Sequence, residues 1–120
     1  GEAYTASGLT GKVVLDGSTS IAPVMEALAD AYKALNPDVT VEIQQTGSGA
    51  GITSAIEGVC DFGMASRALK DSEKAELVST QIASDGIAIV VNNDNTIDEL
   101  TSEQIKNIYL GETTDWSEIK

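Results

Sequence analysis

The chain has 120 residues, of which 7 are Lys or Arg and 19 are Asp or Glu, so its formal net charge is -12 at pH 7. This acidic excess argues against a nucleic-acid partner, because phosphate backbones are held by basic patches. No run of about 18 apolar residues is present to cross a membrane. The absence of histidine and the single cysteine, Cys60, exclude His-based triads, Cys/His zinc sites and an internal disulfide. No metal site and no cofactor are predicted.

The first part of the chain predicts alternating strands and helices. Residues 1–11 are small and polar and indicate a flexible leader. The apolar run "KVVLD" at 12–16, ended by Gly17, is typical of a buried parallel strand. Apolar residues then recur every three or four positions from Ile21 to Leu35, which predicts an amphipathic helix that ends at "NP".

Two further strand and helix pairs follow. "TVEIQQT" at 40–46 alternates and predicts a second strand. "GSGAG" at 47–51 leads into a short helical pattern, "DFGMAS" at 61–66 predicts a third strand, and "SRALKDSEKAELV" predicts a turn and a helix. This order predicts an α/β fold with three layers, in which a mainly parallel sheet carries helices on both faces.

The rhythm changes in the last third of the chain. "GIAIVVN" at 86–92 predicts a strong strand. "TSEQ" at 101–104 has the pattern of a capping box, with Leu100 and Ile105 placed as its hydrophobic staple. The helix that follows should end at Gly111. We therefore expect a β/α unit over 12–92 and a crossover helix within 93–120.

Three predicted turns between a strand and a helix should meet, because such turns emerge at the carboxyl edge of a parallel sheet. Their sequences are "DGSTS", "TGSGAG" and "ASRAL". Helices that begin near Ser20 and Gly49 would point unpaired N–H groups at this edge, where the helix dipole also favours an anion. Hydroxyl groups can add donors there, from Ser18, Thr19, Ser20, Ser48 and Ser66. The pattern predicts a cradle for a small anion.

Arg67 is the only arginine of the chain and falls in the third of these turns. A guanidinium binds an oxyanion with two parallel hydrogen bonds, which a lysine cannot do. The alternative is an arginine paired with a surface acid, and the alternative for "STS" is a simple helix cap.

Three functions stay open on these residues alone. The first is a phosphate-binding module, and the second is a doubly wound enzyme domain that uses a nucleotide or a phosphosugar. The third is a flavodoxin-like scaffold without a ligand. The enzyme is disfavoured because Ile52 stands where a dinucleotide fingerprint needs glycine, and because no G-K-[ST] ending completes a P-loop.

The segment from "GSTSIAPVMEALADAY" to "CDFGMASRAL", together with "IYLGETTDW", closely resembles the N-terminal part of phosphate-binding proteins of ABC phosphate importers. The resemblance implies one lobe of a type II periplasmic-binding-protein fold, which closes on phosphate. It also implies a role for three hydroxyl-bearing turns: Thr19 and Ser20 would bind from the first, Ser48 from the second, and Ser66 with Arg67 from the third. The three hydroxyls at 18–20 would then cap a helix and present its start to the anion.

The chain departs from the family's pattern in two respects. Some members have an aspartate at the place of Ser66, where it accepts a hydrogen bond from a protonated phosphate oxygen. Here Asp16, Asp61 or a residue outside this chain would have to serve. Family members also continue past residue 120 into a second lobe, so we expect a truncated form or a fragment.

The resemblance further implies a location and partners. It places the protein in a periplasm or on the outer face of a membrane, with a signal sequence that is not part of this chain. Its partners would be inorganic phosphate and an importer permease, and it would not be an enzyme. For a chain without its second lobe, self-association or strand exchange is expected.

Overall fold

The computed structural model describes residues 3–119, and their contacts divide the chain into two compact units, Gly1–Ile82 and Ala83–Lys120. The division falls before residues 86–92, which the sequence assigned to the first unit. Whether those residues belong to a first lobe stays a prediction. Within residues 3–119 no helix is long and apolar enough to cross a membrane.

The first unit is built on a parallel sheet with the order β2-β1-β3. Its strands are β1 (Gly11–Gly17), β2 (Val39–Gln44) and β3 (Phe62–Met64). Leu15 of β1 pairs with Ile43 on one side and with Phe62 on the other, so β1 is central. The apolar strand predicted at 12–16 is thus the buried centre of the sheet, as its continuous apolar run indicated.

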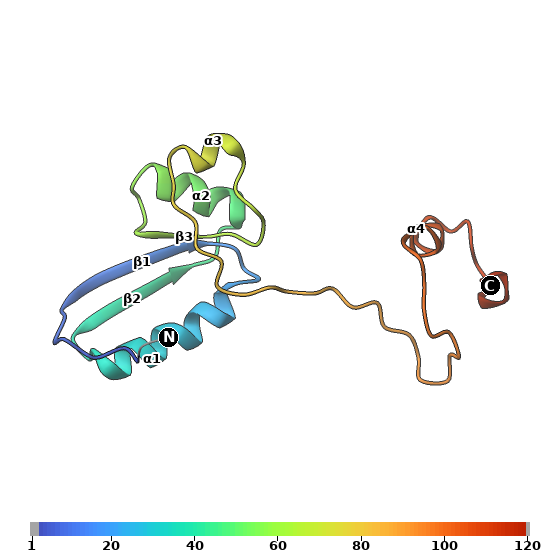
Figure 1. Cartoon of the computed structure of the whole chain (residues 1–120), viewed down its shortest axis with the longest axis horizontal. Coiled ribbons are helices and arrows are strands. Elements are labelled where there is room, and N and C mark those ends of the chain that lie inside the picture. Colours follow the sequence, from blue (N-terminus) through green and yellow to red (C-terminus); the bar gives the residue numbers. More distant parts are fainter. Residues whose placement is uncertain (1–2, 120) are drawn as a thin grey trace. The chain divides into compact units, whose positions relative to one another are not determined.

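Helices cover both faces of this sheet. Helix α1 (Ala22–Leu35) connects β1 to β2, and α2 (Ser48–Ile56) connects β2 to β3. The two connections run in opposite directions along the sheet, so right-handed crossovers put their helices on opposite faces. Figure 1 shows α1 on one side of the strands and α2 on the other. The predicted α/β fold in three layers is confirmed.

Close packing between α2 and β1 depends on glycine. A Cβ atom on Gly51 would lie 2.4 Å from the Asp16 carbonyl oxygen and 2.4 Å from Gly17 Cα. Gly17 itself has a φ of 140°, and a Cβ there would lie 2.2 Å from the Met64 carbonyl oxygen. Both positions exclude any larger residue, so they bring the helix and both strands close together at the carboxyl edge.

The third helix is shorter than the sequence suggested. Helix α3 covers only Asp71–Lys74. The chain before it, at 65–70, forms the turn that leaves β3. The short length follows from local composition, because the residues after Lys74 place no apolar stripe against the sheet, and Val78 is 99% exposed.

Part of the predicted leader is held by an aromatic contact. The rings of Tyr4 and Tyr32 are 5.6 Å apart between centroids. Asn36, which is 1% exposed, donates from Nδ2 to the Tyr4 hydroxyl over 3.1 Å. This asparagine ends α1 and also accepts from the Val39 N–H, so one buried polar residue fixes the connection to β2.

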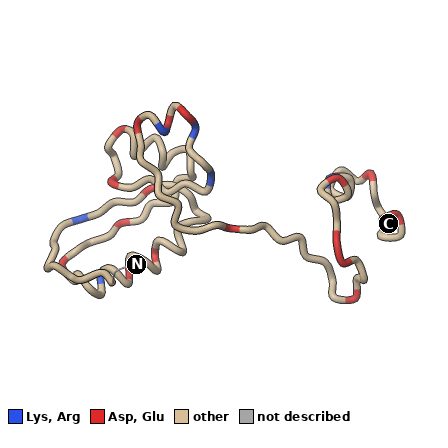
Figure 2. The backbone as a smooth tube through the Cα atoms, viewed as in Figure 1, with Lys and Arg blue, Asp and Glu red and all other residues tan. Residues whose placement is uncertain are grey.

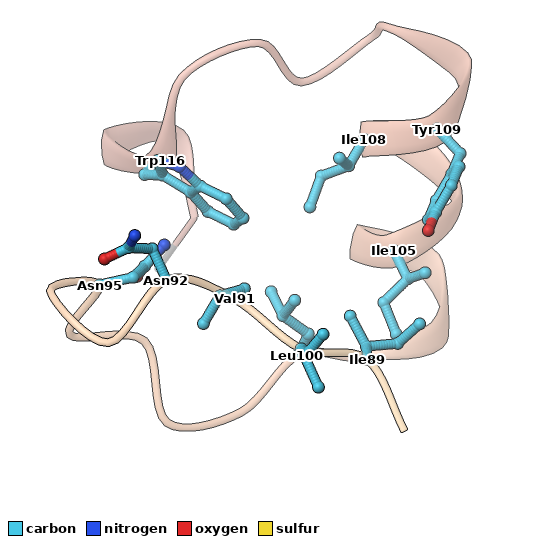
Figure 3. Close-up of a pocket in the computed structure, with 10 residues that line it drawn as sticks. Ile89, Val91, Asn92, Asn95, Leu100, Ile105, Ile108, Tyr109 and Trp116 are labelled. Carbon is cyan, nitrogen blue, oxygen red and sulfur yellow. The ribbon is translucent and has the colours of Figure 1, made fainter. Parts of the chain in front are cut away.

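The second unit contains α4 (Ser102–Leu110) and a short 3-10 helix, η1 (Trp116–Glu118). Thr101 and Gln104 form the predicted capping box, since Thr101 Oγ1 accepts from the Gln104 N–H and Gln104 Oε1 accepts from the Thr101 N–H. The helix ends at Gly111 in the left-handed region with a φ of 75°, as predicted. Figure 3 shows Leu100, Ile105, Ile108 and Trp116 around an apolar cavity of about 240 Å³.

The predicted strand at 86–92 is wrong for this structure. Residues 86–92 form no strand, and Ile87 and Val90 are 96% and 84% exposed. The β-branched run favours an extended backbone. A strand also needs a hydrogen-bonded neighbour, and among residues 3–119 no segment pairs with this one. The sequence pattern indicates a preference for extended backbone, but it does not show whether a neighbouring strand is present.

Candidate anion-binding site

The three turns predicted to meet at the carboxyl edge of the sheet are joined by hydrogen bonds. The Ser18 N–H donates to the Met64 carbonyl over 3.0 Å, and the Gly47 N–H donates to the Gly17 carbonyl over 2.8 Å. The first turn is therefore tied to both the second and the third. This convergence confirms the prediction made from the order of strands and helices.

Ser48 and Ser66 are predicted site residues from different turns, and they are in hydrogen-bond contact. Their hydroxyl oxygens are 3.0 Å apart, and the Ser66 N–H donates to Ser48 Oγ over 3.1 Å. Because Ser48 Oγ accepts from this backbone group, its own hydrogen is free to donate either to Ser66 Oγ or to a ligand. Ser48 begins α2 and Ser66 follows β3, so the pair joins the second and third turns.

The start of α2 presents unpaired backbone donors beside these hydroxyls. Its N-cap is Gly47, with a φ of 97° and no side-chain cap. The first intrahelical bond in this turn runs from the Gly51 N–H to the Gly47 carbonyl. The N–H groups of Ser48, Gly49 and Ala50 thus have no intrahelical partner, and they sit at the positive end of the helix dipole.

The predicted helix cap at 18–20 is wrong. The N-cap of α1 is Ile21, and no side chain caps it. The Ser18 carbonyl accepts from the N–H groups of Ile21 and Ala22, so backbone groups satisfy this first turn. Ser18 is only 3% exposed, while Thr19 and Ser20 are exposed and have no hydrogen-bond partner within residues 3–119. Their hydroxyls stay available to a ligand.

Arg67 lies in the third turn, but it is already paired. Its Nη1 and Nη2 donate to Oε2 and Oε1 of Glu73, each over 2.8 Å, and Nη1 also donates to the Ala68 carbonyl over 2.9 Å. Hydrogen bonds from Arg67, and then from the Lys70 N–H, hold the pKa of Glu73 at about 2. Arg67 is therefore paired with a surface acid, the alternative named for it above, and no sequence pattern identified Glu73 as the partner.

A basic cluster accompanies this turn in an otherwise acidic chain. Arg67, Lys70 and Lys74 are three of the seven basic residues and fall within eight positions. Figure 2 shows a group of blue segments around α3, with red acidic positions among them, and other blue segments elsewhere in the chain. Two of those acids, Asp71 and Glu73, pair with Lys74 and Arg67. With three basic and two acidic residues, the stretch 67–74 has a net charge of +1 in an otherwise strongly acidic chain.

The buried Asp16 side chain holds two segments at the carboxyl edge of the sheet in place. It is 5% exposed and accepts from the Thr46 hydroxyl at Oδ1 over 2.6 Å and from the Ser54 hydroxyl at Oδ2 over 2.8 Å. One carboxylate at the end of β1 thus holds the second turn and the middle of α2. The only sign in the sequence was an aspartate that closes an apolar strand before glycine.

Neither aspartate considered as an acceptor for a protonated phosphate oxygen has both oxygens free. Both oxygens of Asp16 accept from hydroxyls of the chain itself. Asp61 precedes β3, away from its carboxyl end, and its Oδ2 accepts from the Val14 N–H over 2.8 Å.

Cys60, beside Asp61, is buried. Burial, followed by the charges of Asp16 and Asp61, raises the pKa of its thiol.

Comparison with known proteins gives this edge a context. A family model described as a PBP superfamily domain matches residues 2–119. The "Phosphate-binding protein PstS 2" of Streptococcus agalactiae is 50% identical over 119 residues, which are 98% of this chain and 41% of the relative. The protein of the same name in Streptococcus pneumoniae is 45% identical, over 98% of this chain and 40% of its own length.

Solved structures agree with these relatives. A phosphate-binding protein of a phosphate ABC transporter from Streptococcus pneumoniae matches with a TM-score of 0.94 and 45% identity, over 98% of this chain and 46% of that one. A putative phosphate ABC transporter substrate-binding protein with bound phosphate, from Clostridium perfringens, matches with a TM-score of 0.75 and 51% identity. This match covers 91% of this chain and 45% of the Clostridium perfringens chain.

The chain spans about two fifths of the length of the curated relatives it matches. The resemblance to phosphate-binding proteins of ABC phosphate importers, noted on the sequence, is confirmed by these relatives. With a family model that covers residues 2–119, the chain belongs to the PBP superfamily.

Proposed function

We propose that this chain binds inorganic phosphate at the carboxyl edge of its sheet. The observation that carries the proposal is the meeting of three turns, marked by the 3.0 Å separation of the Ser48 and Ser66 hydroxyls. Relatives named for phosphate binding support the same ligand.

The donors at this edge suit a tetrahedral oxyanion. The start of α2 supplies the N–H groups of Ser48 and Gly49, and hydroxyls come from Thr19, Ser20, Ser48 and Ser66. Backbone donors at a helix start bind anions without requiring a positive net charge. This matters in a chain of net charge -12, where long-range attraction of an anion is absent. Ser18 supports the site indirectly, since its side chain is buried and its N–H, which donates to the Met64 carbonyl, holds the first turn against the third.

Selectivity at this edge follows from the acceptors it offers. Because the oxygens of Asp16 are taken by Thr46 and Ser54, the hydroxyl oxygens of Ser48 and Ser66 are the acceptors closest to the donors. A hydroxyl can donate to a bare oxygen as well as accept from a protonated one. We therefore expect this edge alone to discriminate only modestly between phosphate and sulfate.

The wider role is a solute-binding protein of an ABC phosphate importer, acting outside the cytoplasm in a periplasm or on the outer face of a membrane. Relatives more than twice as long support a two-lobed receptor in which this edge forms one face of the site. The partner is then the importer's permease, and the role is binding rather than catalysis. The affinity of the 120-residue chain should be much lower than that of such a receptor.

The test is a titration of phosphate into this chain at low salt, followed by calorimetry and by backbone amide NMR, with sulfate as the comparison. We expect saturable shifts at Thr19, Ser20, Ser48 and Gly49. Arg67→Ala should weaken binding at least about tenfold, since it removes a charged donor. The matched control is Lys70→Ala, which removes the same charge from the same turn and should change affinity little.

Two results contradict the proposal. Amides at all three turns that stay unmoved by phosphate in the folded chain would exclude binding at this edge. A nucleotide or phosphosugar that binds far more tightly than phosphate would point to the enzyme alternative. Light scattering during the titration measures the mass of the chain, and therefore also tests the predicted self-association.

A further inference from the structure

We propose that Glu73 is a positioning residue for Arg67, and that it orients the guanidinium so that its Nε–Nη2 edge binds two oxygens of the phosphate. This inference rests on the proposed function. It adds a residue outside the three turns to the binding apparatus.

The hydrogen bonds of Arg67 determine which edge of its guanidinium group remains available to a ligand. A guanidinium carries five N–H donors in a fixed planar fork. Glu73 takes one from Nη1 and one from Nη2, and the Ala68 carbonyl takes the second from Nη1. Within residues 3–119 no partner is recorded for the two remaining donors, on Nη2 and Nε. These two N–H groups are parallel neighbours, which is the geometry that grips two oxygens of one anion.

Glu73 is itself held firmly enough to orient a partner. Its Oε2 also accepts from the Lys70 N–H over 2.7 Å, and its own N–H donates to the Lys70 carbonyl over 3.0 Å. Its side chain is only 14% exposed, against 36% for Arg67. The carboxylate is therefore fixed by the backbone of Lys70, the N-cap of α3, and the more exposed arginine is fixed by the carboxylate. Ser66, next to Arg67, is bonded to Ser48 and so ties the same turn to α2.

A purely structural role for the pair predicts something different. If Glu73 only closed the turn between β3 and α3, its loss would lower stability and leave the affinity of the folded protein unchanged. If Glu73 instead competed with the anion for Arg67, its loss would raise affinity. A positioning role predicts that affinity falls when Glu73 is removed, and that this loss disappears when Arg67 is already absent.

The first measurement uses the fact that Arg67 is the only arginine of the chain, so its Nε–H gives a single side-chain signal in a ¹H–¹⁵N spectrum. Without ligand, Glu73→Ala should shift this signal and speed its exchange with water at least severalfold. Asp71→Ala is the matched control, because it removes the same charge from the same helix but pairs with Lys74 rather than Arg67. An Nε–H signal that Glu73→Ala leaves in place would overturn the positioning role without any ligand.

The second measurement adds phosphate. We expect the Nε–H signal of the unsubstituted chain to shift saturably, and Glu73→Ala to weaken binding about tenfold or more. Glu73→Gln keeps the shape and one acceptor oxygen and should restore part of the affinity. The double variant of Arg67→Ala and Glu73→Ala should bind like Arg67→Ala alone.

Failure of this inference and failure of the proposed function give different spectra. If amides of Thr19, Ser48 and Gly49 move with phosphate while the Nε–H signal does not, phosphate binding stands and the role of Arg67 is refuted. Affinity that is unchanged or higher in Glu73→Ala refutes positioning in the same way. If no signal moves at any phosphate concentration, the proposed function of this edge fails as well.

Discussion

The hydroxyl oxygens of Ser48 and Ser66 lie 3.0 Å apart although 18 positions separate these residues in the chain. One starts α2, and the other follows β3. Their contact depends on the parallel sheet, since the order β2-β1-β3 places the ends of β2 and β3 on either side of β1, at one edge beside Gly17. The hydroxyl groups that join the two turns can also bind an anion. We therefore expect a ligand to replace the Ser48–Ser66 contact with little strain.

Removal of the Ser48 hydroxyl should therefore affect binding more than stability. Ser48→Ala leaves the Ser66 N–H without its partner, at a cost of about 0.5–1.5 kcal/mol because water can reach this exposed turn. Phosphate affinity should fall by at least about tenfold, since one donor to the charged ligand is lost. Urea unfolding and calorimetry measure the two effects separately.

The control for this substitution is Ser72→Ala, since Ser72 is exposed on α3 and its hydroxyl makes no hydrogen bond within residues 3–119. It should leave both quantities unchanged. If Ser48→Ala lowers stability while phosphate affinity stays at its original value, Ser48 is a tether between the turns and not a ligand donor.

Two glycines of α2 should respond in opposite ways to the same substitution. Gly51→Ala places a methyl group 2.4 Å from the Asp16 carbonyl oxygen, and backbone on β1 has to move. A loss of at least about 1–3 kcal/mol of unfolding free energy should follow. Gly49→Ala meets nothing within 4 Å and should be neutral or stabilising by up to about 1 kcal/mol, because alanine favours the helix.

Thermal or urea unfolding without phosphate tests this pair, and each substitution serves as the control of the other. Equal stability for Gly51→Ala and Gly49→Ala would mean that α2 does not approach β1 as closely as described. The result would also weaken the account of the site, because the unpaired N–H groups of α2 are placed by this packing.

The sequence predicts features whose causes are local or periodic. The helix from Ala22 to Leu35 follows from apolar spacing, and the capping box of Thr101 follows from a four-residue motif. The convergence of the three turns was also predictable, because a β-α-β order constrains topology strongly. Of the hydroxyls, Thr19 and Ser20 are exposed at this edge as expected, although Ile21 and not a hydroxyl residue occupies the cap.

The features that could not be predicted from the sequence depend on side-chain partners that no sequence pattern identifies. Glu73 and Arg67 pair across a turn and Asp16 binds Thr46 and Ser54, and no spacing rule predicts either set of contacts. The strand predicted at 86–92 was wrong because a pairing partner is missing within residues 3–119. Its composition suits a strand, but a strand requires a neighbour that composition cannot supply.

The buried Asp16 should be a strong determinant of stability. Asp16→Ala removes the acceptor for two hydroxyls, Thr46 Oγ1 and Ser54 Oγ, and leaves a space beside Gly17. We expect a loss of about 2 kcal/mol, toward the upper range for hydrogen bonds to a charged group. Asp16→Asn, which keeps the shape and one acceptor oxygen, should lose less.

The control is Asp38→Ala, which removes an exposed carboxylate that makes no hydrogen bond in the described part of the chain. Urea unfolding of the four proteins gives the comparison. If Asp16→Ala proves as stable as Asp38→Ala, the carboxylate does not hold the second turn, and Thr46 must be placed by its neighbours alone.

The Arg67–Glu73 pair should make stability depend on pH in the acid range. The pKa of Glu73 is about 2 in the folded chain against an ordinary value of 4.5. Above pH 4.5 the carboxyl is ionised in both states, so the pair contributes fully. As the pH falls from about 4.5 toward 2, the unfolded chain takes up this proton first, and the contribution is progressively lost. Stability should therefore rise with pH across this window.

The difference in unfolding free energy between the unsubstituted chain and Glu73→Gln isolates this effect, because all other carboxyl groups cancel. We expect the difference to be constant from pH 7 to about pH 5, to shrink below that, and to be mostly lost by about pH 2. Arg67→Ala removes the main cause of the lowered pKa of Glu73. The difference between Arg67→Ala and the double variant of Arg67→Ala and Glu73→Gln should therefore be small at every pH. A difference for the unsubstituted chain that stays flat from pH 7 to pH 2.5 would mean that Arg67 and Glu73 are not paired in solution. The orientation of the guanidinium toward phosphate would then lose its physical basis.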